Sequence, residues 1–241
     1  MRYALVAYVA SWVVVVCVSL GAWLLFGVSR WGGAGALWFD VAWLASLVPL
    51  YRAGVLSAGD LGLRPASAGR SVGLALLVFV SLGVFDDVWS SALASGSVSN
   101  PFSGVGDRST ALIVLTGVAA VVSPVVEGVF FQGLLFRCFR NRFALLPASV
   151  VIGVMFALVH AEYPLVVLPE LAVYGALACV LYEYTGSLFP AIAINLYLDV
   201  GGFEEALTGT AAIVFWGFVL LVVVLLVRSL RWKLRSRTGS L

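Results

Sequence analysis

Long apolar blocks separated by short polar stretches dominate the chain. Eight of them approach the roughly 20 apolar residues that a helix needs to cross a bilayer. They lie at residues 4–28, 35–51, 71–89, 110–136, 144–161, 165–184, 188–203 and 210–228. This pattern predicts an all-α fold, a polytopic bundle of about eight transmembrane helices.

Composition agrees with a membrane protein. Hydrophobic residues make up 62% of the 241 residues and charged residues 11%, whereas soluble domains carry about 25% charged residues. A soluble fold of this length could not hide so much apolar surface. The length suits one domain, so we expect a single transmembrane domain over residues 1–241 with membrane lipids around it. The first block exceeds the 7–15 residues of a signal-peptide core, so we interpret it as a span.

The basic residues indicate how the predicted helices are oriented, because cytoplasmic loops are enriched in Lys and Arg. If the N-terminus is cytoplasmic, twelve of the fourteen basic residues fall on the cytoplasmic side, and only Arg30 and Arg108 fall outside. We therefore predict that both termini are cytoplasmic. The net charge of +2 does not indicate nucleic acid as a partner. Arg greatly outnumbers Lys, which suggests a G+C-rich prokaryotic gene and hence a multi-pass protein of the cell membrane.

One carboxylate lies deep in the fourth block. Glu127 is ten residues before Arg137, so a helix places it about 15 Å deep, near the midplane. An ionisable group at this depth costs about 3 kcal/mol, and something should compensate that cost or use the group. Other acids lie near predicted helix ends and are interpreted as solvated at the interface: Asp40, Asp86, Asp87, Glu162, Glu183, Glu204 and Glu205.

Three further polar residues fall within later blocks. His160, the only histidine, lies near the outer end of the fifth block. Asn195 and Asp199 are four residues apart, so a helix puts them on one face. Glu127 and Asp199 would repel each other unless one is protonated, a cation binds between them, or one pairs with a charged His160. The residues alone leave open buried polar packing, a catalytic or metal site, and an ion or proton pathway.

Three segments together resemble a known family. They read SPVVEGVFFQGLLF from Ser123, FALVH from Phe156 and YEYTGSLFPAIAINLYLD from Tyr182. They are similar to the CPBP family of CAAX-processing and bacteriocin-processing intramembrane proteases, also called the Abi family. The family pattern is EExxxR, then FxxxH, then HxxxN or HxxxD, on successive membrane helices. The resemblance covers roughly residues 115–203, the expected catalytic core.

The resemblance implies a hydrolase, an intramembrane metalloprotease, and a role for each matching residue. Glu127 matches the first Glu of EExxxR, which activates water in the family. His160 matches the histidine of FxxxH, a catalytic or metal-site residue, and Asp199 matches the closing Asn or Asp. A metal ion would be held by His160, Asp199 and Glu127. The substrate would be a membrane-embedded or lipidated peptide.

The sequence departs from the family pattern at three positions. Gly128 replaces the second Glu and Gln132 replaces the Arg, and losing both members of an ion pair leaves no unpaired buried charge. Asn195 replaces the second motif histidine. A neutral amide is a poor zinc ligand, so zinc would bind weakly or not at all. Alternatively, Glu127 and His160 activate water without tightly bound metal, and Asn195 holds the oxyanion.

Two functions follow from these residues. The first is an endopeptidase in which Glu127 is the general base, His160 assists it, and Asn195 and Asp199 orient or stabilise. The second is a catalytically inactive relative that acts as a membrane binding, scaffold or immunity protein. A transporter is a weaker third option. Helices broken by proline can bind ions, but the sequence shows no sign of the two repeated halves that transporter folds often have.

Overall fold

The computed structural model describes residues 3, 5–10, 12–13, 34–52, 56–57, 59–64, 68–93, 110–160, 163 and 165–205. These residues form helices and connecting turns and contain no strand, so the all-α prediction is confirmed for this part of the chain. The elements are α2 (Ala34–Arg52), α3 (Ala68–Leu93), α4 (Thr110–Glu127), η1 (Gly128–Phe136), α5 (Arg137–Arg140), α6 (Leu145–Val159), α7 (Leu168–Thr185) and α8 (Phe189–Glu205).

The helices lie where the second to seventh apolar blocks predict them. Within the described residues, Gly117–Arg140 is 24 residues long and apolar enough to cross a membrane. Gly73–Phe85 and Leu145–Val159 are shorter apolar helices. The number of eight spans and the cytoplasmic termini stay predictions, because most of the first block and all of the eighth, 210–228, lie outside the described residues.

Large apolar side chains remain exposed along the outer faces of three helices. They recur every three or four residues, as expected for one helical face, on α2, α3 and α6: Val41, Leu44, Val48, Leu77, Val80, Val84, Val150, Val154 and Leu158. Soluble monomers rarely expose contiguous apolar patches of this kind. The outer surface of the bundle therefore suits contact with hydrocarbon.

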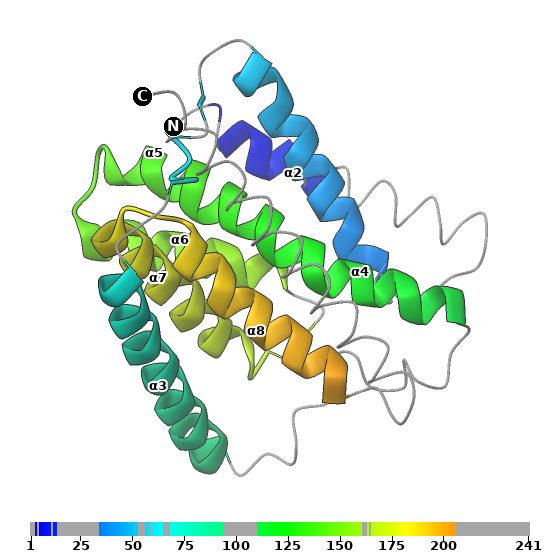
Figure 1. Cartoon of the computed structure of the whole chain (residues 1–241), viewed down its shortest axis with the longest axis vertical. Coiled ribbons are helices and arrows are strands. Elements are labelled where there is room, and N and C mark those ends of the chain that lie inside the picture. Colours follow the sequence, from blue (N-terminus) through cyan, green and yellow to red (C-terminus); the bar gives the residue numbers. More distant parts are fainter. Residues whose placement is uncertain are drawn as a thin grey trace, which may run out of the picture.

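A continuous rod of α4, η1 and α5 runs through the middle of the bundle (Figure 1). It packs against α2 on one side and α8 on another, while α7 packs closely on α6 and also contacts α3. The η1 segment is a π-helix, whose wider turns occur frequently at functional sites. It begins directly after Glu127, so the change from α to π winding falls at the buried carboxylate.

The core is built around the η1 segment. Phe130, Phe131 and Leu135 are fully buried. Trp43 of α2 stacks on Phe130 with ring centroids 5.1 Å apart, and Phe156 of α6 meets Phe131 edge-on at 5.2 Å. Such pairs contribute about 0.5–1.5 kcal/mol beyond the burial of their area. This packing fixes the end of α4, and with it the position of Glu127.

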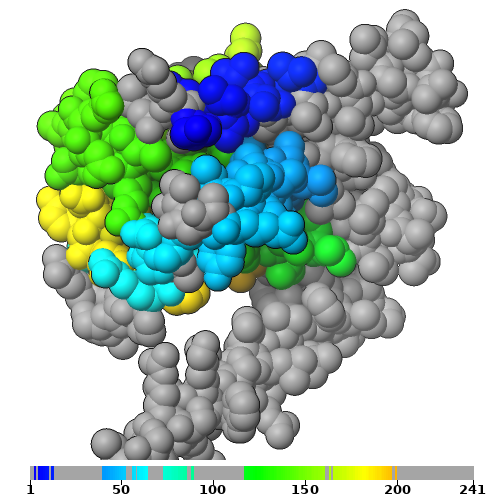
Figure 2. Space-filling view, turned by 90° about the horizontal axis from the view of Figure 1, so that it is seen from above, coloured from blue at the N-terminus to red at the C-terminus, as the bar shows by residue number. Residues whose placement is uncertain are grey.

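Hydrogen bonds connect the loop 59–64 to the turn between α7 and α8. Arg64 donates from Nε to the Gly186 carbonyl at 2.8 Å, and the Ser187 hydroxyl donates to the Arg64 carbonyl at 2.7 Å. Gly186 ends α7 with a left-handed φ of 63°, which glycine adopts without steric cost. Figure 2 shows the loop in cyan beside the yellow α7–α8 region. These bonds hold the start of α8, the helix that carries Asn195 and Asp199.

Candidate active site

Glu127, His160 and Asn195 meet inside the bundle although they come from three helices. Glu127 ends α4 and is only 7% exposed. Its Oε2 accepts a hydrogen bond of 2.9 Å from Nδ2 of Asn195, and its Oε1 lies 3.7 Å from Nε2 of His160. The carboxylate is therefore held between an amide donor and an imidazole.

The orientation of the His160 ring follows from where α6 ends. The backbone N–H of His160 bonds to the Ala157 carbonyl at 3.0 Å, and its side-chain Nδ1 lies 2.8 Å from the Phe156 carbonyl. A carbonyl only accepts, so Nδ1 carries a hydrogen and donates it. In the neutral ring the lone pair is then on Nε2, the atom that faces Glu127. The Phe156 ring also packs on the imidazole at 4.5 Å.

Asn195 supplies a donor that does not titrate. Its amide nitrogen carries two hydrogens, and the bond to Glu127 uses one of them. The second hydrogen remains for another acceptor. Asn195 also lines the adjacent cavity, so this donor stands at the boundary between the buried carboxylate and the open space.

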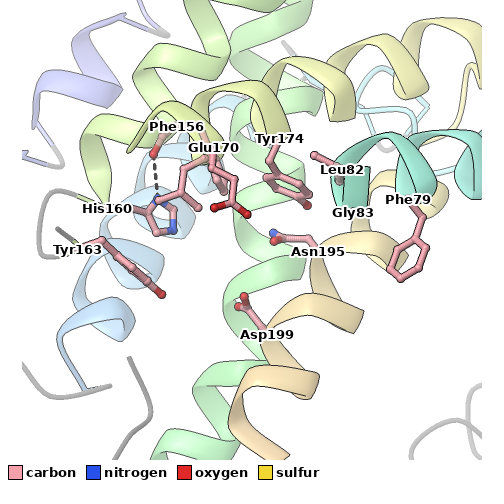
Figure 3. A pocket seen from close by; sticks show the side chains of 11 residues that line it. Phe79, Leu82, Gly83, Phe156, His160, Tyr163, Glu170, Tyr174, Asn195 and Asp199 are labelled. Atoms are coloured by element: carbon pink, nitrogen blue, oxygen red, sulfur yellow. Dashed lines mark hydrogen bonds between the residues drawn. The ribbon is translucent and has the colours of Figure 1, made fainter. Parts of the chain in front are cut away.

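A cavity of about 260 Å³ opens beside these residues (Figure 3). Its polar wall contains His160, Asn195 and Asp199, so the expectation that Asn195 and Asp199 share one face of a helix is confirmed. The complete lining is Phe79, Leu82, Gly83, Phe156, His160, Tyr163, Glu170, Leu171, Tyr174, Asn195 and Asp199. The space is large enough for small reactants. His160, Asn195 and Asp199 line it, while Glu127 contacts His160 and Asn195 and is not itself a lining residue.

The comparison with family models matches residues 109–201 to the Rce1-like family, described as type II CAAX prenyl endopeptidase Rce1-like. This segment is therefore similar to that family. The match confirms the resemblance predicted from the motifs, and it includes all four candidate residues, Glu127, His160, Asn195 and Asp199. No curated protein and no solved structure matches the chain.

The described residues of this segment do not bring together a set of zinc ligands. Catalytic zinc usually takes three protein ligands. Among the described residues, no group of three or more His, Cys, Asp and Glu side chains lies close enough to hold a metal ion. Glu127 and His160 come together, but Asn195 presents its amide nitrogen, a donor, to the carboxylate. Zinc binding by His160, Asp199 and Glu127 stays a prediction.

The packing around Gly128 and Gln132 suits the two departures from the first motif. A Cβ added at Gly128 in η1 would stand 2.6 Å from Cγ1 of Ile192, so the side chain of this α8 residue occupies the space that a longer side chain at 128 would need. Gln132 is 4% exposed and carries no charge. The pair of replacements thus leaves no buried charge unpaired and brings α8, with Asn195, close to Glu127.

Several residues of the cavity were not found from the sequence. Glu170 lies in the first turn of α7, where the helix dipole favours a carboxylate, and its place after Pro169 was the available signal. Tyr163 and Tyr174 also line the cavity. The α3 residues gave no signal, because apolar periodicity is uninformative in a helix that is apolar all round.

The interpretation of Asp40 as an interfacial acid was wrong. Asp40 is only 2% exposed, and it accepts a hydrogen bond from the Ser123 hydroxyl across the α2–α4 contact. Its Oδ1 has no hydrogen-bond partner among the described residues. Ser123 lies one helical turn before Glu127, so a second buried carboxyl supports the helix segment that carries the candidate base.

Proposed function

We propose that the chain is an intramembrane endopeptidase of the Rce1-like type, which hydrolyses a peptide bond in a prenylated or membrane-embedded peptide. One observation carries the proposal. The buried Glu127 carboxylate lies 2.9 Å from the Asn195 amide nitrogen and 3.7 Å from His160 Nε2, beside a 260 Å³ cavity.

Water activation would use the gap between Glu127 and His160. Their 3.7 Å separation exceeds a direct hydrogen bond, but a water about 2.8 Å from each atom would bond to both. Because His160 Nδ1 already donates to Phe156, the neutral ring offers Nε2 as an acceptor for one water hydrogen. Glu127 accepts the other hydrogen as general base. The hydroxide oxygen then bonds to the carbonyl carbon of the substrate.

The remaining hydrogen of the Asn195 amide would stabilise the resulting oxyanion. A preorganised donor of this kind is worth about 10²–10³ in rate. When the intermediate collapses, the C–N bond breaks and Glu127 returns its proton to the leaving amine nitrogen. Asp199, one helical turn from Asn195 on the cavity wall, would orient the bound peptide.

Cleavage of prenylated and transmembrane peptides by the purified protein in lipid vesicles tests the proposal. Glu127→Gln should abolish cleavage, since the amide cannot take a proton from water. Glu183→Gln is the matched control, because it is the same substitution at an exposed residue that forms an ion pair with Arg140. Unchanged cleavage by Glu127→Gln would show that the mechanism is wrong.

A catalytically inactive binding, scaffold or immunity protein is the second candidate. It is favoured by Asn195 in place of the motif histidine and by the uncharged pair Gly128 and Gln132. This alternative predicts that the purified chain cleaves neither class of peptide and that Asn195→His alone restores little. Gain of both metal and cleavage by that single variant would argue against it.

A further inference from the structure

The cavity has two chemically different walls. His160, Glu170, Asn195 and Asp199 contribute polar groups from the end of α6 and from α7 and α8, while α3 contributes an apolar face. The three α3 residues are Phe79, Leu82 and Gly83, spaced so that they lie on one side of the helix. Figure 3 shows them at one end of the cavity and His160 at the other, with Asn195 and Tyr174 between.

Gly83 and Gly73 of α3 differ from four other helical glycines of the described residues, and of the two only Gly83 lines the cavity. A Cβ at Gly128, Gly133, Gly153 or Gly175 would press against a neighbouring helix or loop, so packing explains those four. A Cβ at Gly83 would meet nothing within 4 Å. Glycine inside a helix costs about 0.5–1 kcal/mol of stability relative to Ala. At position 83 no neighbouring element lies close enough to exclude a larger side chain, so packing does not explain the glycine.

We infer that Gly83 is a specificity-determining residue, which leaves room against α3 for a large apolar side chain of the substrate next to the scissile bond. The inference rests on the proposed function and names the kind of peptide that the same site accepts. A cavity of about 150 Å³ lined by apolar side chains is enough to hold benzene. A cavity of about 260 Å³ leaves space for an aromatic side chain together with a reacting carbonyl and a water.

The position of the apolar wall fixes what it would recognise. A peptide whose carbonyl lies at Asn195 and His160 would place an adjacent side chain toward α3, because both walls belong to one cavity. Phe79 and Leu82 offer contacts to an aromatic or branched group and no hydrogen bond from their side chains. Filling the space at Gly83 should therefore exclude large groups and spare small ones.

Two substrates and two variants test this selection. The peptides differ only in the residue beside the scissile bond, Phe in one and Ala in the other. Gly83→Leu should lower the ratio of kcat/KM for Phe over Ala by about tenfold or more, the size of effect that one or two methylenes have in a substrate pocket. Gly73→Leu is the matched control, since Gly73 lies two to three turns earlier on α3, is also open and does not line the cavity.

A ratio that changes equally in both variants, or stays at the wild-type value in Gly83→Leu, would overturn the inference while leaving the proposed function standing. If the wild-type protein cleaves neither peptide, the proposed function fails and binding decides the inference. A peptide carrying photoreactive benzoylphenylalanine in the same position should then crosslink to 79–83 in the wild-type protein and in Gly73→Leu, and much less in Gly83→Leu. Absence of that crosslink in the wild-type protein would refute it.

Discussion

Replacing Asn195 by Ala tests whether this amide, which stands in place of the motif histidine, stabilises the oxyanion. The variant removes the 2.9 Å bond to the Glu127 carboxylate and the second N–H of an amide that lines the cavity. A hydrogen bond to a charged group contributes about 1.5–3 kcal/mol, and one oxyanion donor contributes about 2.7–4 kcal/mol to the transition state. The two terms share one side chain and do not add. We expect kcat to fall by about 10²–10³.

The assay is steady-state cleavage of a prenylated peptide by Asn195→Ala, and it measures whether the variant changes kcat or KM. A donor used mainly in the transition state lowers kcat and leaves KM within a few-fold. Asn141→Ala is the matched control, because Asn141 is exposed at the end of α5. Retention of kcat within about twofold in Asn195→Ala, or a rise in KM alone, would refute the assignment of Asn195 as an oxyanion donor.

Three further variants probe the supports of the site through thermal unfolding. Gly186→Ala places a Cβ at φ 63° and should cost about 1–2 kcal/mol of stability. Ser123→Ala leaves the buried Asp40 carboxyl without its hydroxyl donor and should cost about 1–3 kcal/mol, whereas an unchanged Tm would mean that this bond is not important. The hydroxyl and backbone N–H of Ser57 lower the pKa of Asp60, so its stabilisation is complete above the ordinary pKa and is lost as the pH falls through the lowered one. In Asp60→Asn the Tm should lose that acid dependence.

The helices were predictable because each follows a long apolar block of the sequence, close to the roughly 20 residues expected of a membrane span. α2, α3 and α6 to α8 lie within a few residues of the predicted blocks. The π-helix η1 was not predicted, because the composition of an apolar run does not distinguish an α-helix, with i→i+4 backbone hydrogen bonds, from a π-helix, with i→i+5 bonds. The depth of Asp40 was misjudged because distance from a helix end gives no information about the helix packed opposite.

The site was predictable to the extent that a motif defines it. Glu127, His160 and Asn195 came from the order and spacing of three segments, and they meet as expected. The sequence could not show which nitrogen of His160 faces the carboxylate, because that depends on how α6 ends at Phe156. The α3 wall, with Gly83, lies outside the residues that match the Rce1-like family and became visible only through the cavity.

The close approach of Ile192 to Gly128 limits the mutational paths open to this protein. A return to Glu at position 128 would first need a smaller residue at 192, and an Arg placed at 132 alone would be a buried guanidinium without a counterion, at several kcal/mol. Each single step toward the charged form of the motif therefore passes through a less stable protein. The packing of Ile192 on α8 against Gly128 in η1 therefore disfavours the charged form of the motif.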